Sequence, residues 1–112
     1  MKDILKLQAE LCKIFANDKR LEIINLLRER EMSTGELMEM TGLSKVSMSQ
    51  HMNVLKSKGV IAVRREGVQL YYTIDNPKII QASDLMKDVL FEQLRERQRE
   101  VSHLVETPVH PS

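Results

Sequence analysis

The stretch LSKVSMSQHMNVLKSKGV, residues 43–60, decides the fold of this chain of 112 residues. It begins with polar and hydroxyl-bearing residues, and Met48, Met52 and Leu55 form an apolar series at spacings of four and three residues. Residues at those spacings share one face of a helix. The stretch therefore predicts a helix over 45–57 that packs on the rest of the domain through one narrow apolar stripe.

The opposite side of this helix carries hydroxyl, amide and amine groups. Glutamine and asparagine can bond the edge of an adenine with two hydrogen bonds, serine can bond bases or a phosphate, and valine can contact a thymine methyl group. This composition is typical of a helix that enters the major groove of DNA with its amino end first. We expect His51, at the edge of the apolar stripe, to be structural. The residues expected to contact DNA are Ser44, Lys45, Val46, Ser47, Ser49, Gln50, Asn53 and Lys56.

Two helices are expected at the start of the chain. Apolar residues at helical spacing predict the first over 4–16 and the second over 19–30. Asp18 lies directly before the second apolar series, and aspartate accepts hydrogen bonds from the free N–H groups of a first helical turn. We therefore expect Asp18 to be the N-cap of the second helix.

A short third helix and a turn precede the opening stretch. In STGELMEM, residues 33–40, either Ser33 or Thr34 can cap this helix. Gly42 is expected to end it, because glycine adopts the positive φ of a turn without the strain that a side chain would cause. Ser44 is then suited to cap the next helix. This region predicts two helices joined by a tight turn.

Two β-branched runs follow, VIAVRR at 60–65 and QLYYTI at 69–74. The intervening Glu66-Gly67-Val68 predicts a hairpin with a three-residue loop. Helix, turn, helix and then hairpin is the order of a winged helix-turn-helix, in which the hairpin is the wing and lies on phosphates or in the minor groove. The residues expected to contact DNA from the hairpin are Arg64, Arg65 and Gln69.

The end of the chain predicts a long helix and a tail. Apolar residues continue at helical spacing over 78–104, and Pro108 and Pro111 interrupt the pattern after it. We therefore expect one domain over 1–106 and a flexible tail over 107–112. The expected fold class is mainly α with a small β-hairpin, in the order α-α-α-α-β-β-α.

The charge of the chain is unevenly distributed. The net charge is +1, but residues 44–76 carry five basic and two acidic side chains, a local +3, which leaves −2 for the rest. A basic segment between acidic flanks fits binding to a polyanion. The chain is 42% hydrophobic and 29% charged, as soluble globular proteins are. It has no long apolar run, and its N-terminus is unlike a signal peptide, so a cytoplasmic location is expected.

Three segments together resemble the ArsR/SmtB family of bacterial and archaeal repressors, which are small dimeric winged-helix proteins. FANDKRLEIINLL at 15–27 resembles the alanine, arginine and leucine-rich helix with which the family pattern opens. LSKVSMSQHMNVLKSKGVI at 43–61 resembles its recognition helix, and RREGVQLYYTI at 64–74 resembles its wing. The resemblance covers roughly residues 8–90.

The resemblance implies a homodimer formed through the first and last helices. A symmetric dimer presents two recognition helices to half-sites one or more DNA turns apart. The implied partners are a second copy of the chain and double-stranded DNA with an imperfect palindrome, and the implied function is repression by occlusion of a promoter. Core packing within one chain is the alternative for these apolar residues. The residues expected at the dimer interface are Ile4, Leu7, Leu11, Met86, Leu90 and Leu94.

The sensor sites that the resemblance implies are incomplete in this sequence. The third-helix site needs thiolates, and STGELMEM contains no cysteine. The last-helix zinc-type site has only two suitable ligands, and an arginine in it would repel a cation. Glu100 and His103 could join Asp84 or Asp88, but a solvated charged face is favoured. No metal or cofactor is therefore expected, and the effector is not identified. The residues in register with the zinc-type site are Asp84, Met86, Arg97 and Glu100.

Cys12 is the one cysteine, so a disulfide within the chain is excluded. Its position near Leu5 and Phe15 predicts a buried, small apolar side chain. The alternative hypothesis is that the two Cys12 thiols of a dimer approach each other and that their oxidation changes DNA affinity. An unchanged oxidant response in a Cys12→Ser protein would exclude that hypothesis.

A second interpretation is a protein-interaction adaptor that uses the helix over 45–57 as a docking surface. That function predicts an apolar or acidic helix face, whereas this face is rich in hydroxyls and amides. An enzyme is not expected, because the sequence has no Ser-His-Asp order, no glycine-rich phosphate loop and no paired carboxylates at useful spacing.

Overall fold

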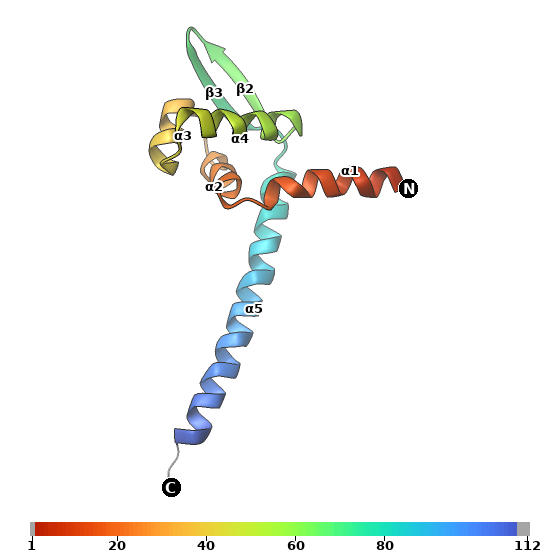
Figure 1. Ribbon diagram of the computed structural model, residues 1–112, viewed down its shortest axis with the longest axis vertical. Coiled ribbons are helices and arrows are strands. Elements are labelled where there is room, and N and C mark those ends of the chain that lie inside the picture. The colour runs from red at the N-terminus through yellow and green to blue at the C-terminus, as the bar shows by residue number, and fades with distance from the viewer. Residues whose placement is uncertain (1, 110–112) are drawn as a thin grey trace. The chain divides into compact units, whose positions relative to one another are not determined.

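The computed structural model describes residues 2–109, and the side chains of 3–102 among them. The chain divides into two compact units, Met1–Gln81 and Ala82–Ser112. No helix among residues 2–109 is long and apolar enough to cross a membrane. The elements of the chain in order (Figure 1) are α1 (Lys2–Cys12), the 3-10 helix η1 (Lys13–Phe15), α2 (Asp18–Leu27), β1 (Met32–Ser33), α3 (Thr34–Thr41), α4 (Lys45–Ser57), β2 (Ile61–Glu66), β3 (Gln69–Ile74) and α5 (Lys78–Val109).

The first two helices differ from the prediction at their ends. The expected helix over 4–16 tightens into η1, because the guanidinium of Arg20 donates to the carbonyl oxygens of Lys13 and Ile14 at 3.0 and 3.1 Å. Asn17, and not Asp18, is the N-cap of α2, since its side-chain oxygen accepts from the backbone N–H of Arg20 at 3.1 Å. The expected helix over 19–30 stops at Leu27, and the chain turns to bring Met32 into the sheet.

The helix-turn-helix forms as predicted, and its caps explain why. Ser33 accepts from the backbone N–H of Glu36 at 3.1 Å, and Glu36 accepts from that of Ser33 at 3.1 Å, which makes a capping box. Gly42 ends α3 with φ at 73°. Ser44 then caps α4 by accepting from the backbone N–H of Ser47 at 3.2 Å. The predicted bounds of the fourth helix, 45–57, are confirmed.

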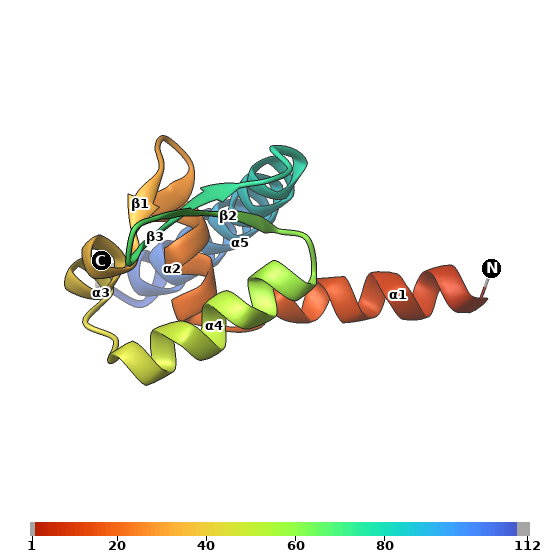
Figure 2. The same ribbon diagram turned by 90° about the horizontal axis from the view of Figure 1, so that it is seen from above.

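The hairpin belongs to a three-stranded antiparallel sheet with β3 in the middle (Figure 2). β1 is not predicted from the sequence, because two residues carry no periodicity of their own. The predicted three-residue loop is wrong, because Glu66 pairs with Gln69 and leaves only Gly67 and Val68 in the turn. Gly67 has φ at 63°, which glycine provides at the first position of a two-residue hairpin turn.

The core of the first unit lies between its helices and the sheet. The predicted stripe of α4 is confirmed, since Met48, Met52 and Leu55 are all buried. In addition, β2 contacts α4, while β3 contacts α2 and α3, so α4 is held directly beside the hairpin. The buried apolar side chains are Ile14, Ile23, Ile24, Leu27, Met32, Leu37, Met48, Met52, Leu55, Val60, Ile61, Tyr72 and Ile79.

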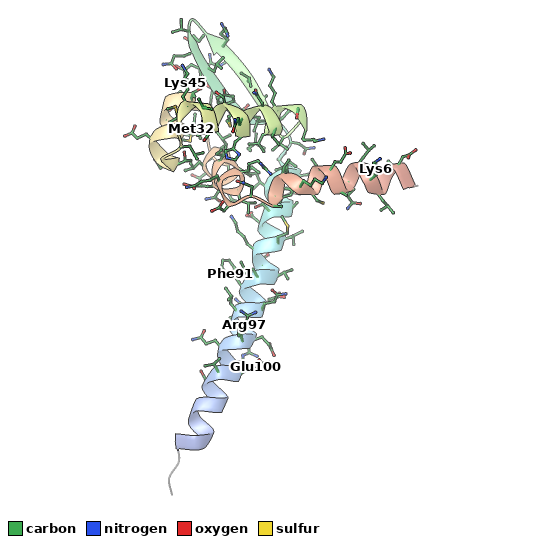
Figure 3. All side chains as sticks on the ribbon, in the orientation of Figure 1. Lys6, Met32, Lys45, Phe91, Arg97 and Glu100 are labelled. Carbon is green, nitrogen blue, oxygen red and sulfur yellow. The ribbon has the colours of Figure 1, made fainter. Side chains whose placement is uncertain are left out.

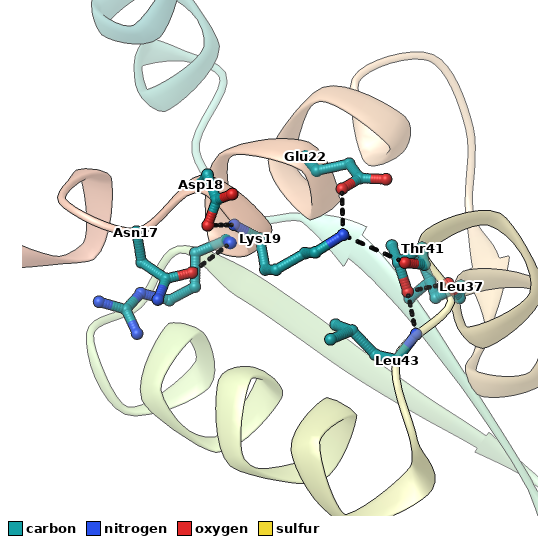
Figure 4. A network of polar contacts seen from close by, with 8 residues as sticks. Asn17, Asp18, Lys19, Glu22, Leu37, Thr41 and Leu43 are labelled. Carbon is teal, nitrogen blue, oxygen red and sulfur yellow. Dashed lines mark hydrogen bonds and ion pairs between the residues drawn. The ribbon is translucent and has the colours of Figure 1, made fainter.

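A small polar network fixes the turn between α3 and α4 (Figure 4). The buried hydroxyl of Thr41 donates to the carbonyl of Leu37 at 2.7 Å and accepts from the backbone N–H of Leu43 at 3.2 Å. Lys19 on α2 donates to the carbonyl of Thr41 at 3.3 Å and pairs with Glu22 at 3.3 Å. These contacts hold the turn against α2 and thereby set the direction in which α4 leaves it.

Replacing Thr41 with Val should lower the free energy of unfolding by about 1–3 kcal/mol, because the Leu43 N–H loses its partner in a partly buried site. Valine keeps the shape and branching of threonine, so little packing changes. Urea unfolding at fixed protein concentration measures the effect. Thr73→Val is the matched control, because Thr73 is half-buried on β3. Equal stabilities of the two variants would contradict this role of the Thr41 hydroxyl.

The second unit consists of α5 from Ala82 onward. The helix runs to Val109, beyond the predicted end at 104. The expected tail over 107–112 overlaps its last three residues, and positions 110–112 lie outside the described residues, so the flexible tail stays a prediction. This part of α5 exposes a series of large apolar side chains, namely Leu85, Met86, Val89, Leu90, Phe91, Leu94 and Val101.

Candidate nucleic-acid interface

The outward face of α4 presents the predicted base-reading groups. Val46, Ser49, Gln50 and Asn53 are all exposed, and their spacings of three, one and three residues place them together on one face of the helix. That face lies opposite the buried stripe, so the helix is anchored on one side and open on the other. A helix of 13 residues is about 20 Å long, which suits the major groove.

Two adjoining grooves are lined by residues of both α4 and the hairpin. The first is lined among others by Lys45, Ser49 and Gln69, and the second by Asn53 and Lys56. Lys45 stands at the first turn of α4, near the hairpin (Figure 3). Among the side chains that the structure describes, no acidic one lines either groove. Polar side chains and cations thus follow the whole length of α4 on its hairpin side.

Arg65 lines both grooves, so it is the cation at which they meet. Arg65 pairs with Leu70, which lines the same two grooves. Because successive residues of a strand point to opposite faces, Arg65 points to the groove side of the sheet and its neighbour Arg64 does not. Within the described chain, no carboxylate lies at ion-pair distance from Arg65, Lys45 or Lys56. Three cations are therefore available to an anion in the grooves.

Arg64 occupies the other face of the sheet. Its guanidinium donates to both carboxylate oxygens of Glu31 at 2.7 and 3.1 Å and to Glu66 at 2.7 Å. It also lies over the ring of Tyr71, 4.5 Å from the centroid. Hydrogen bonding to Glu31 and then to Glu66 raises the pKa of Arg64, and the Arg64 hydrogen bond lowers the pKa of the Glu31 carboxyl. The structure thus separates two arginines that the sequence analysis grouped together.

Two further residues at the start of α4 have structural contacts. Ser44 uses its hydroxyl as the helix cap, although its side chain stays exposed. Ser47 is half-buried, at the margin of the open face. His51 is half-buried too, and burial first and the nearby charge of Arg20 second lower its pKa, which favours the neutral form of the ring. The structural role expected for His51 agrees with this environment.

Thr34 and Gly35 at the start of α3 line the first groove beside Lys45 and Arg65. Neither residue is predicted from the sequence to belong to the site. The capping box at Ser33 was a local signal that a helix begins there, with free backbone N–H groups that favour anions. That this helix end faces the hairpin depends on long-range packing.

The other predicted positions are exposed in the single chain. Cys12 is exposed, so its expected burial is wrong for the chain by itself; it is near the end of α1, a helix with little cover along its length. Arg97 and Glu100 are exposed on α5 (Figure 3). No group of three or more possible metal ligands occurs among the described side chains, which do not include His103. The residues predicted for the dimer interface are 36–62% exposed, namely Ile4, Leu7, Leu11, Met86, Leu90 and Leu94.

Comparisons with known proteins agree with this architecture. Residues 17–63 match the family described as bacterial regulatory protein, arsR family. The uncharacterized HTH-type transcriptional regulator Rv0081 of Mycobacterium tuberculosis is 38% identical over 95 residues, which are 84% of this chain and 83% of that protein. Its crystal structure matches with a TM-score of 0.78 over 84% of this chain and 95% of the solved chain.

Two other proteins extend the comparison. The transcriptional activator HlyU of Vibrio cholerae is 35% identical over 69 residues, covering 62% of this chain and 64% of that protein. The homodimeric winged helix-turn-helix DNA-binding domain of Mb0332 from Mycobacterium bovis, a possible ArsR-family regulator, is 30% identical. Its solution structure matches with a TM-score of 0.76 over 85% of this chain and 88% of that one. The matched segment 17–63 contains α4 and the turn before it.

Proposed function

The chain belongs to the arsR family of bacterial regulatory proteins, and we propose that it is a homodimeric repressor that binds a specific DNA operator. The relatives are named as transcriptional regulators, which are not enzymes, and in the Mb0332 fragment the winged helix-turn-helix is named as a DNA-binding domain. Beyond membership of the family, we propose which surface contacts DNA, that the chain forms a dimer, and that it represses transcription. Its site of action is proposed to be the cytoplasm, where the chromosome of a bacterium lies.

The open face of α4 beside the grooves carries the proposal. Amide and hydroxyl groups at Ser49, Gln50 and Asn53 are free to read base edges in the major groove. Lys45, Lys56 and Arg65 follow the same helix along its hairpin side and would neutralise phosphates of one DNA strand. Ser44, Val46 and Gln69 complete the proposed surface, and Ser47 lies at its margin. Arg64 is also expected from the sequence to contact DNA, but we leave it out of the proposed surface, because two carboxylates hold its guanidinium.

The dimer is proposed to form through exposed apolar residues of α1 and α5. Ile4 and Leu7 are 62% and 59% exposed, and Leu90 is 50% exposed, which is unfavourable for side chains of that size in water. The homodimeric state of the Mb0332 domain supports the same assembly here. Two copies of α4 related by a twofold axis would fit an imperfect palindrome with half-sites about one or more DNA turns apart.

Gln50→Ala and Arg65→Gln should weaken DNA binding in two different ways. Loss of the Gln50 amide should cost about 1–3 kcal/mol for the cognate sequence only, so base preference relaxes. Loss of the Arg65 charge should weaken binding to all sequences and lower the slope of log affinity against log salt by roughly one. Titrations at several salt concentrations measure both effects. Identical behaviour of the two variants would contradict this division of roles.

Fluorescence anisotropy with a labelled duplex from the region upstream of the chain's own gene, and with a scrambled duplex, tests the function itself. A preference of ~10³-fold or more is expected of an operator-binding protein. Equal, weak and salt-sensitive binding to both duplexes would call for the same titration with duplexes from neighbouring promoters. If these gave the same result, a protein-interaction adaptor would be favoured over an operator-binding protein. A promoter–reporter fusion decides the direction of regulation: lower expression with the protein supports repression, and higher expression would make it an activator, as HlyU is named.

A further inference from the structure

Arg64 bridges the two outer strands of the sheet across the middle one. Its strand, β2, lies at one edge, and Glu31 directly precedes β1 at the other edge. The guanidinium passes over Tyr71 of the middle strand β3, with its central carbon 4.5 Å from the ring centroid. It reaches both oxygens of Glu31 at 2.7 and 3.1 Å. We call this arrangement of Glu31, Arg64, Glu66 and Tyr71 the strap.

The strap lies where the hairpin leaves the sheet. β1 pairs only with Tyr71 and Tyr72 of β3, so the neighbouring pair Arg64–Tyr71 is the last one of the hairpin that β1 supports. Beyond it, Arg65–Leu70 and Glu66–Gln69 are paired with each other alone. The wing tip from 65 to 70 is thus a two-stranded ribbon, and an isolated ribbon is marginally stable in water. The strap is therefore placed where it can limit movement of this ribbon.

We propose that Arg64 is a positioning residue that fixes the angle of the wing and so holds Arg65 beside α4. The proposal rests on the proposed DNA-binding function for its effect on affinity, but the mechanical part concerns the protein alone. Arg64 and Arg65 adjoin in sequence and point to opposite faces. An arginine anchored on one face consequently determines where the next side chain projects on the other face.

The contacts of Arg64 make a direct phosphate contact unfavourable. Three of its N–H groups donate to carboxylates, and its planar face is occupied by Tyr71. Turning the guanidinium toward DNA would leave the carboxylates of Glu31 and Glu66 without their cation, close to a polyanion. Exposed ion pairs usually contribute little to stability, but a two-bond Arg–carboxylate pair within a network is the recognised exception. The strap has that geometry.

The first test uses the protein without DNA. Amide hydrogen exchange at residues 65–70 should be faster in Arg64→Gln and Glu31→Gln than in the wild type, while exchange in α4 stays the same. Glu29→Gln is the matched control, because it removes the same charge from an exposed residue of the same segment and should leave exchange unchanged. Unchanged exchange of the wing in Arg64→Gln would overturn the proposal, whatever the protein does with DNA.

The second test measures affinity for the operator duplex against salt. Arg64→Gln and Glu31→Gln should each lower affinity several-fold without changing the salt slope, and the double variant should be no weaker than either one. Arg65→Gln should instead lower the slope by roughly one. A Glu31→Gln protein with higher affinity, or an Arg64→Gln protein with a lower slope, would overturn the proposal and make Arg64 a phosphate contact that Glu31 restrains. If the wild type binds the operator and scrambled duplexes equally, the proposed function fails. The exchange experiment would then still show whether the strap limits movement of the wing.

Discussion

Leu90→Asp should convert the proposed dimer to monomers and lower operator affinity by ~10³-fold or more, toward non-specific binding. Leu90 is 50% exposed on α5, and Met86 and Leu94 lie one turn to either side of it with 46% and 47% exposure. If these residues form the dimer interface, the substitution puts a carboxylate into an apolar contact, where an unpaired charge is costly. One monomer can engage only one half-site, so the affinity that depends on the second recognition helix is lost.

Sedimentation and operator titration should be measured on the same protein sample. Glu92→Lys is the control, because position 92 lies on the opposite side of α5 from Leu90 and is exposed. It changes the charge by more than Leu90→Asp does and should leave the dimer intact. If Leu90→Asp stayed dimeric with unchanged affinity, the dimer would have to form through another surface. A monomeric variant with wild-type affinity would instead show that operator binding does not need the dimer.

The features that the sequence predicted correctly depend on neighbouring residues. The bounds of α4 follow from Ser44 at one end and an apolar stripe that repeats with the helical period. The turn before it follows from Gly42, whose φ of 73° favours glycine. Each of these signals spans only a few positions, so a single sequence is enough to find it. The same holds for the hairpin, whose two β-branched runs flank a glycine.

The features that it missed depend on residues far apart in the chain. β1 exists because Met32 and Ser33 pair with Tyr72 and Tyr71, and a two-residue strand has no pattern of its own. The alternation of side chains along a strand could have separated Arg64 from Arg65, but not shown that Arg64 meets Glu31, 33 positions away. The charge of an arginine is visible in a sequence, whereas its partner is a property of the fold.

The core beneath α4 should be sensitive to the loss of a single side chain. Leu55→Ala should lower the free energy of unfolding by about 2–5 kcal/mol, because Leu55 is fully buried and its removal leaves a cavity among well-packed neighbours. The same loss should weaken operator binding, since the stripe that contains Leu55 anchors the helix that carries Gln50 and Asn53. Urea unfolding should be measured at one protein concentration, because the stability of a dimer depends on the concentration of the protein.

Val54→Ala is the matched control, because Val54 adjoins Leu55 on α4 but is 37% exposed. Alanine is also the better helix former, so the change in unfolding free energy should stay within about 0.5 kcal/mol. The pair compares a fully buried and a partly exposed apolar side chain at adjacent positions of one helix. A Leu55→Ala protein as stable as Val54→Ala would mean that the core does not close under α4. The recognition helix would then lack the rigid support on which the proposed base contacts of Gln50 and Asn53 depend.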